Sequence, residues 1–269
     1  MSDPRGPVHV TGEVVATKKV GAYRQLTLTA PGVPERFRAG SFVALSVADR
    51  TTRRSFWVHR VRQVGAYGPT LDVVVEPRGE GTQRLAALPV GAKVPLTGPL
   101  GRPFALPKEP VSCLLVGEGH GAAPLFPLAE RLRERGCTVA LVIAAPDEAH
   151  LLSALEARRS VRAVTVLTAD GSVGQRGTVG DAVADLVRRS AADVVYGAGP
   201  VPVVHAVAAA AEAAGAWSQV ALEVDTPCGT GLCHGCALPV LGEDGVARVV
   251  RACTEGPVVR GDRVRWADL

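Results

Sequence analysis

The chain has 269 residues, of which 47% are hydrophobic, and a formal net charge of +4. This length allows about two domains of roughly 100–200 residues each, and the composition excludes a disordered chain. The charge is too small and too scattered to favour nucleic-acid binding. The N-terminus lacks the apolar segment of a signal peptide, and no apolar run is long enough to predict a membrane span. We therefore expect a cytoplasmic protein.

The first 108 residues predict a β domain. Six short β-rich runs, separated by glycine and proline turns, are typical of a small closed antiparallel barrel. A short helix is expected at 82–88, between the last two strands. The six strands are expected at 8–17, 22–30, 42–48, 54–60, 70–76 and 93–98.

After a proline-containing linker at 106–110, strands alternate with helices. This alternation predicts a Rossmann-like α/β domain at 109–222, with a parallel sheet covered by helices on both faces. Strands are expected at 111–117, 138–144, 161–168, 193–196 and 219–223. Helices are expected at 123–135, 148–158, 178–188 and 201–214.

Four of the six cysteines crowd into the C-terminal tail, a predicted domain at 223–269. Cys228, Cys233 and Cys236 have C-x4-C-x2-C spacing, and Cys253 follows after sixteen residues. This is the spacing of plant-type [2Fe–2S] clusters, which prefer thiolate ligands. A cluster would also stabilise a tail that is too small to build its own core. A structural zinc site is the alternative, but zinc usually takes two closely spaced cysteine pairs.

Two glycine-rich turns follow predicted strands of the α/β domain. Gly119 and Gly121 lie after the first strand, and Gly199 and Pro200 lie after the fourth. The carboxyl ends of parallel strands meet at one edge, where open α/β sheets bind ligands and where helix N-termini accept a pyrophosphate. The turns therefore predict an NAD(H) site, with plain tight turns as the alternative.

A candidate phosphate site lies in the barrel. Arg54 can pair with a phosphate, and Gly81 and Thr82 begin the expected helix, where free N–H groups favour an anion. Phe56 and Trp57 offer aromatic faces on which a flavin ring could stack. The alternative is an exposed strand with solvated arginines.

Taken in order, these motifs resemble those of the ferredoxin–NADP reductase superfamily. The cysteine pattern and the closing segment 253–262 are more specific, and they resemble the electron-transfer subunit of type B dihydroorotate dehydrogenase. The stretch 168–177 is also similar to that family. The resemblance implies a flavin barrel, a nicotinamide domain and a [2Fe–2S] domain. It implies that FAD binds at Arg54, Ser55, Phe56, Trp57, Val74, Val75, Glu76, Gly81 and Thr82.

The resemblance also implies a function. A [2Fe–2S] cluster would exchange single electrons with FAD, and FAD would exchange a hydride with NAD(H). A catalytic flavoprotein partner would oxidise dihydroorotate to orotate in pyrimidine biosynthesis, within a heterotetramer of two plus two subunits. We expect no catalytic residue in this chain. Two alternatives remain open: a reductase component that serves another oxidoreductase or oxygenase, and a non-catalytic iron–sulfur partner without flavin.

Several positions depart from the family pattern. Trp57 replaces a small hydroxyl residue beside the flavin, and Ala198 replaces the usual cysteine of the second turn. Glu118 and His120 stand in the nucleotide turn, where glycine and a small or aliphatic residue are usual. The dipeptide at 226–227 is Thr-Pro in place of Met-Ala.

Overall fold

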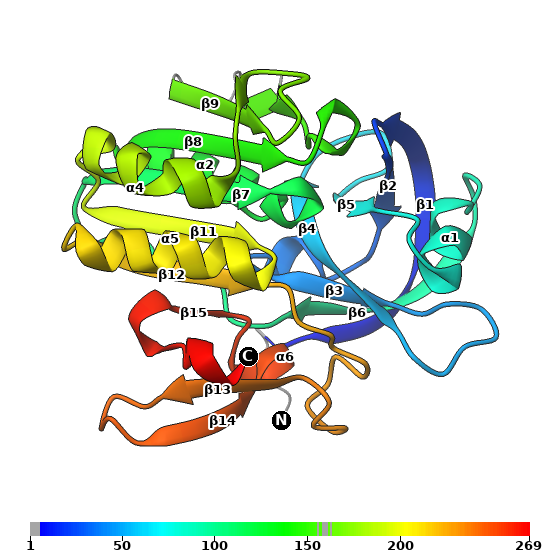
Figure 1. Ribbon diagram of the computed structural model, residues 1–269. Coiled ribbons are helices and arrows are strands. Elements are labelled where there is room, and N and C mark those ends of the chain that lie inside the picture. Colours follow the sequence, from blue (N-terminus) through cyan, green and yellow to red (C-terminus); the bar gives the residue numbers. More distant parts are fainter. Residues whose placement is uncertain (1–5, 155, 158–160, 162) are drawn as a thin grey trace.

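The computed structural model describes residues 6–154, 156, 157, 161 and 163–269. Two sheets dominate it, a closed barrel and an open sheet, and a small C-terminal unit lies beside both (Figure 1). The predicted order of barrel, α/β domain and C-terminal unit is confirmed.

The barrel closes in the order β1-β2-β5-β4-β3-β6, with antiparallel neighbours throughout. Side chains alternate along its strands, so that Val73 and Val75 enter the barrel core, whereas Val74 faces the α/β domain. Helix α1 (Glu80–Ala86) begins two residues before the predicted position. The strands are β1 (Val8–Val20), β2 (Tyr23–Thr29), β3 (Phe42–Leu45), β4 (Arg54–Arg62), β5 (Thr70–Val75) and β6 (Lys93–Leu100).

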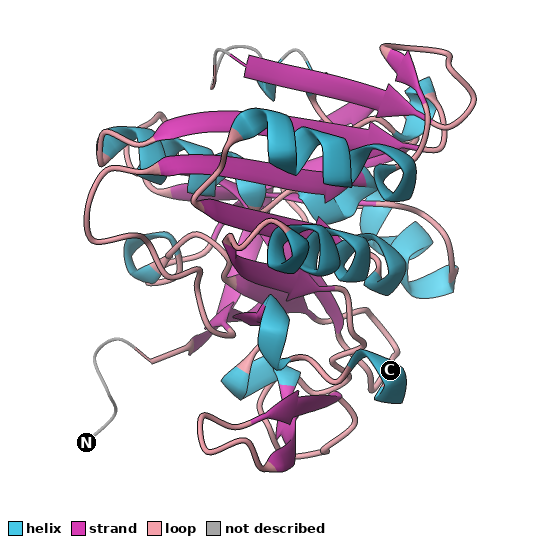
Figure 2. Cartoon of the chain, turned by 60° about the vertical axis from the view of Figure 1, so that its left-hand side comes forward, coloured by secondary structure: helices cyan, strands magenta, loops and turns pink. Residues whose placement is uncertain are grey.

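The open sheet has the order β10-β9-β8-β7-β11-β12-β15, and all its neighbours are parallel except β12 and β15. Helix α2 (Leu125–Glu134) covers one face, and α4 (Val179–Ser190) and α5 (Val201–Ala213) cover the other (Figure 2). The strands are β7 (Ser112–Glu118), β8 (Thr138–Ala145), β9 (Ala163–Thr168), β10 (Gln175–Arg176), β11 (Val194–Gly199), β12 (Trp217–Leu222) and β15 (Val258–Arg260).

The predicted helix at 148–158 is wrong at its beginning. Only a 3-10 turn, η3 (Glu148–His150), forms there, capped by the Asp147 side chain, which accepts a hydrogen bond from the His150 amide. Ser153 then takes a positive φ of 50°, which interrupts helical geometry. Residues 155 and 158 of the prediction lie outside the described residues.

The C-terminal unit shares its core with both larger parts. It contains the hairpin β13 (Ala237–Leu241) and β14 (Ala247–Arg251) and the short helix α6 (Ala252–Glu255). Leu238 packs in one cluster with Phe42 of the barrel and Leu222 of the open sheet. The unpredicted strand β15 then pairs with β12 and covers that sheet edge. The tail is therefore anchored by packing as well as by its cysteines.

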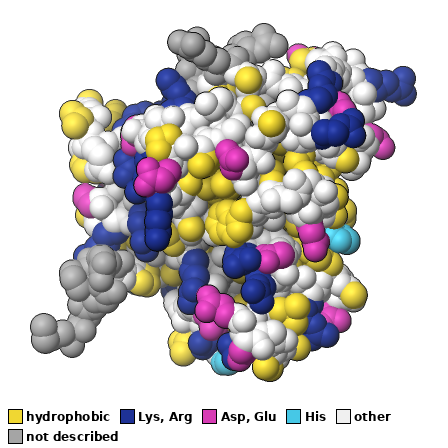
Figure 3. Space-filling view, turned by 90° about the vertical axis from the view of Figure 1, so that its left-hand side faces the viewer, with side chains coloured by type: hydrophobic (Ala, Val, Ile, Leu, Met, Phe, Trp, Pro, Cys, Tyr) yellow, Lys and Arg dark blue, Asp and Glu magenta, His cyan; other side chains and the backbone are white. Residues whose placement is uncertain are grey.

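Charges of both signs are interspersed on the face seen in Figure 3, around a hydrophobic area near its middle. Among the described residues, none of the helices has the length and apolar character needed to cross a membrane.

A buried histidine lies where the barrel meets α2. His59 on β4 is 1% exposed, and its ring lies edge-on to Phe126 with the ring centroids 4.7 Å apart. Its Nε2 lies 3.5 Å from Glu156, but neither ring nitrogen has a hydrogen-bond partner in the described part of the chain. Burial, together with the neighbouring Arg60, lowers the pKa of His59 to about 4.

This histidine predicts acid sensitivity. The unfolded chain would bind a proton on His59 near pH 6.5, whereas the folded chain binds it only near pH 4. The contribution of His59 to the free energy of unfolding is therefore complete above pH 6.5. It is lost, by about 3 kcal/mol, as the pH falls to about 4. The variant His59→Phe should lose this part of the pH dependence in urea unfolding, and the exposed His205→Phe should keep it. An unchanged pH profile for His59→Phe would contradict the prediction.

Candidate functional site

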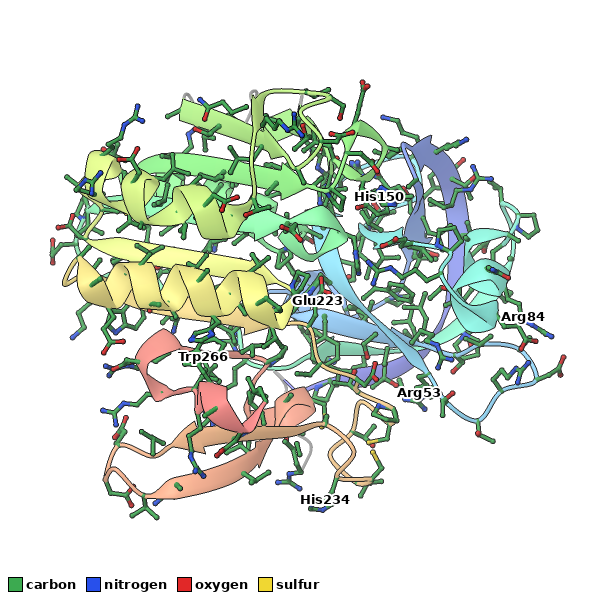
Figure 4. All side chains as sticks on the ribbon, in the orientation of Figure 1. Arg53, Arg84, His150, Glu223, His234 and Trp266 are labelled. Atoms are coloured by element: carbon green, nitrogen blue, oxygen red, sulfur yellow. The ribbon has the colours of Figure 1, made fainter. Side chains whose placement is uncertain are left out.

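A cavity of about 410 Å³ lies between the barrel and the carboxyl edge of the open sheet. Its volume is within the usual range of small-molecule pockets, about 300–1,000 Å³. Glu223, labelled in Figure 4, marks this junction at the end of β12. The barrel contributes Phe42, Arg54, Ser55, Phe56, Trp57, Val74, Glu76, Arg78 and Thr82, and the rest of the chain contributes His120, Ala123, Leu222, Glu223, Val224, Asp225, Thr226 and Pro257.

The structure brings the two predicted halves of the phosphate site together. A Cβ on Gly81 would lie 3.0 Å from Nε of Arg54, so the guanidinium rests directly on the beginning of α1. The Arg54 Nη1 donates to the hydroxyl of Thr52 at 2.9 Å, which holds the guanidinium in place. Thr82 lines the cavity, whereas the side chain of Val75 points into the barrel core.

Trp57 forms part of the cavity wall. Its indole lies edge-on to Phe42 with the ring centroids 6.1 Å apart, and it packs against the cores on both sides of the cavity. The cavity is present with the indole in this position. The geometry therefore fits a wall against which a flat ring can lie.

The two glycine turns of the open sheet touch each other. Strands β7 and β11 are parallel neighbours, so their carboxyl ends lie side by side. A Cβ on Gly121 would lie 2.6 Å from the Cα of Gly199 and would collide with the Glu223 carboxylate. Gly119 has a φ of 56°, and Pro200 precedes α5 at its N-cap. These close approaches require glycine and leave backbone groups open at the edge of the sheet.

Acidic groups at this edge are unusual for a site that receives a pyrophosphate. Burial raises the pKa of the Glu223 carboxyl above its usual range. Burial, with the nearby Glu223, also raises the pKa of Glu118. Both carboxyls therefore bind protons more readily than exposed glutamates do, which reduces their repulsion of an anion.

The four predicted ligands form two pairs. Cys228, Cys233 and Cys236 lie in the loop before β13, which we call the cysteine loop, and Cys253 lies on α6. Cys236 and Cys253 are buried with their sulfurs 3.4 Å apart, whereas Cys233 is exposed and Cys228 is half-buried. Backbone N–H groups of Thr230 and Gly235 donate to Cys228 and Cys233, each at 3.4 Å. His234, labelled in Figure 4, lies in the same loop.

This arrangement fits a two-iron cluster better than zinc. At tetrahedral metal–sulfur bonds of about 2.3 Å, two thiolates on one metal lie roughly 3.8 Å apart, close to the Cys236–Cys253 separation. A single zinc ion would gather all four thiolates around one point, but no three metal-ligating side chains converge in this way among the described residues. Burial acts to raise the pKa of Cys228, yet hydrogen bonds from Thr230 and Cys233 outweigh it and lower the pKa to about 5. Cys228 is therefore suited to bind as a thiolate.

The cysteine loop rests on the candidate flavin segment. The Arg53 amide donates to the carbonyl of Pro227 at 3.3 Å, and the Ser55 and Thr226 hydroxyls hydrogen-bond to each other. A Cβ on Gly229 would lie 3.0 Å from the Ala44 side chain, so the loop packs closely on the barrel. The first cysteine is therefore two residues from a side chain that lines the cavity.

Several cavity residues escaped the sequence analysis. Glu223 ends the predicted strand 219–223 at the carboxyl edge of the sheet, and this position was an available signal. Thr226 stands two residues before the first cysteine, but nothing in the sequence places it against Ser55. The other missed lining residues are Phe42, Arg78, Ala123, Leu222, Val224, Asp225 and Pro257.

Comparison with known proteins gives consistent matches. Residues 227–265 match the family model described as the iron–sulfur cluster binding domain of dihydroorotate dehydrogenase B. The chain is 32% identical over 257 residues to the dihydroorotate dehydrogenase B (NAD(+)) electron transfer subunit of Bacillus caldolyticus. This match covers 93% of this chain and 96% of the relative. It is 30% identical over 241 residues to the electron transfer subunit homolog of Thermotoga maritima, over 89% and 82% of the two chains.

Solved structures show the same architecture. A chain of the NADH-dependent reduced ferredoxin-NADP oxidoreductase, described for flavin-based electron bifurcation, superposes with a TM-score of 0.84 at 28% identity, over 96% of this chain and 91% of that one. The Amycolatopsis cytochrome P450 reductase GcoB superposes with a TM-score of 0.63 at 23% identity, over 77% and 66% of the chains. The predicted ferredoxin-reductase-like fold is therefore confirmed.

Proposed function

The chain belongs to the family of electron-transfer subunits of dihydroorotate dehydrogenase B, and from this premise we propose that it carries electrons between a partner flavoprotein and NAD through a [2Fe–2S] cluster and FAD. One observation carries the proposal most directly. The cysteine loop and the cavity share a wall, through the contacts of Arg53 with Pro227 and of Ser55 with Thr226. A cluster in the loop would thus lie beside a flavin in the cavity.

Each group would be held by residues of this chain. Arg54 with the Gly81–Thr82 helix start would bind the FAD phosphates, and Trp57 would orient the flavin ring. Phe56 also lines the cavity, but its side chain belongs to the barrel core. The glycine turns at 119–121 and 199–200 would receive the NAD pyrophosphate. The flavin supplies the exchange between one-electron and two-electron transfer. The proposed domains are 1–108 for FAD, 109–222 for NAD and 223–269 for the cluster.

The substrate chemistry belongs to a partner. We assign no residue of this chain to dihydroorotate oxidation, because the cavity lining of the described chain holds no cysteine or lysine, and its serine, Ser55, hydrogen-bonds to Thr226. The family name implies a catalytic subunit, and we propose an assembly of two plus two subunits.

This division of labour predicts a clear kinetic result. The isolated, cofactor-loaded chain should reduce a dye with NADH but should not oxidise dihydroorotate with NAD. Addition of the catalytic flavoprotein should restore dihydroorotate oxidation, measured as NADH formation at 340 nm. Dihydroorotate oxidation by the chain alone would contradict the subunit assignment.

A second candidate partner is a different oxidoreductase. The solved neighbour with 28% identity is part of an NADH-dependent ferredoxin-NADP oxidoreductase, so this architecture also occurs in another electron-transfer enzyme. If the loaded chain reduces dyes but never couples to a dihydroorotate-oxidising flavoprotein, this second candidate is favoured.

A further inference from the structure

Three titratable side chains from three separate elements meet at the edge of the cavity. Glu76 follows β5 of the barrel, His120 lies in the turn after β7, and Glu223 follows β12. The imidazole stands between the two carboxylates, with Nδ1 3.3 Å from Oε2 of Glu76 and Nε2 3.8 Å from Oε1 of Glu223. All three line the cavity. We call these three residues the carboxylate–histidine triad.

The two facing carboxylate oxygens are buried and lack hydrogen bonds. Within the described ranges, neither Oε2 of Glu76 nor Oε1 of Glu223 has a partner with hydrogen-bond geometry. Nη2 of Arg78 lies 2.7 Å from the same Glu76 oxygen and forms an ion pair with it. Buried carboxylate oxygens without hydrogen bonds are costly. The triad is therefore incomplete at Oε1 of Glu223, which has neither a hydrogen bond nor a close cation in the described chain.

A single proton would complete it. Neutral imidazole has one N–H group and can donate to only one of the two carboxylates, whereas imidazolium donates from both nitrogens. Burial also raises the pKa of Glu223, which favours proton binding at this place. The other titratable groups that face the triad are Tyr23, Arg78, Glu118, Asp147 and His150.

These neighbours leave the triad in acidic surroundings. Arg78 is the one permanent cation in that group, and it faces Glu76 from the exposed side. His150 lies 3.8 Å from Oε1 of Glu76 but is already paired with Asp147 at 2.8 Å. A further negative charge in the cavity would therefore favour protonation of the triad, because charges interact strongly in partly buried sites.

We propose that the carboxylate–histidine triad is a redox-linked proton site, which takes up one proton from solvent when flavin in the cavity is reduced and releases it on reoxidation. This rests on the proposed function, which places the flavin there. Two electrons, from NADH as a hydride or singly from the partner flavoprotein, convert oxidised flavin plus one proton equivalent into reduced anionic flavin. The triad binds a second proton, which offsets that negative charge. His120 acts as a positioning and proton-holding residue.

The test measures how the potential of the bound flavin depends on pH. Each proton taken up with an electron pair changes the reduction equilibrium tenfold per pH unit, or about 30 mV for a two-electron couple. Spectroelectrochemical titration of the holoprotein should show two protons per electron pair at pH values where reduced flavin is anionic. His120→Gln keeps a side chain that can hydrogen-bond but cannot hold the proton, and its slope should fall to one proton.

Two further variants separate this role from a structural one. Glu223→Gln should also reduce the slope to one proton, while the exposed His205→Gln on α5 should keep the wild-type slope. Retained cluster absorbance shows that each variant is folded. Equal slopes in wild type and His120→Gln would overturn the inference and leave the proposed function intact. Wild-type protein that binds no flavin at all would instead refute the proposed function.

Discussion

Cys233→Ser is expected to abolish the visible absorbance of the iron–sulfur cluster and to loosen the C-terminal tail. Loss of outer-shell partners alone costs metal sites about 10–100-fold in affinity, so removal of a ligand should cost more. Binding free energy of the cluster is also folding free energy, because the unfolded loop holds no site. Absorbance spectra of anaerobically purified protein and limited proteolysis of the tail measure the two effects.

The position of Cys233 makes this variant informative. Its side chain is exposed, so serine at this position removes a ligand without opening a cavity in the core. Cys137→Ser is the matched control, since Cys137 is a buried thiol of the α/β domain. The control should keep full cluster absorbance. Stoichiometric zinc in place of iron in the wild-type protein would refute the cluster assignment.

Arg54→Ala is expected to weaken FAD binding by about tenfold to a hundredfold while the cluster absorbance persists. A charge-assisted hydrogen bond to phosphate contributes roughly 1.5–3 kcal/mol, which corresponds to that loss. The Arg54 side chain lies against Gly81 at the helix start, whereas the contacts with the cysteine loop come from the Arg53 amide and the Ser55 hydroxyl. Arg131→Ala on α2 removes an exposed arginine from a surface ion pair and should leave FAD affinity unchanged. Flavin fluorescence titration measures both.

Substitution of Trp57 tests whether its indole forms a wall of the flavin site or fills the site. If the indole forms a wall of the flavin seat, wild-type protein holds FAD and Trp57→Ser gains nothing. If the indole fills the seat, wild-type protein purifies without flavin and Trp57→Ser acquires it. That second outcome would remove flavin chemistry from this chain and favour the non-catalytic iron–sulfur alternative.

Local sequence patterns predict most of the helices and strands of the fold. Short β-rich runs between glycine and proline turns identify the barrel strands. They do not show which way each side chain points: Val73 and Val74 are identical residues but lie in different cores. The helix predicted at 148–158 is wrong at its beginning, because the composition favours a helix but the positive φ of Ser153 interrupts it. Strand β15 carried no local signal, because its three residues become a strand only by pairing with β12.

The candidate site also contains both features that local sequence patterns predict and contacts that they do not. The cysteine spacing and the glycine turns are local motifs, so the sequence could indicate them. The contact of Ser55 with Thr226 and the meeting of Glu76, His120 and Glu223 join residues that are far apart in the chain. Such contacts depend on how the two sheets pack, and no periodicity in one segment encodes them.

The most direct measurement of the central claim is a cofactor analysis of the full chain, purified without oxygen. We expect about two iron and two acid-labile sulfide per chain, as a [2Fe–2S] cluster requires, with about one FAD released on denaturation. Protein with zinc in place of iron, or with a full cluster and no uptake of added FAD, would contradict the account of this chain as an iron–sulfur flavoprotein.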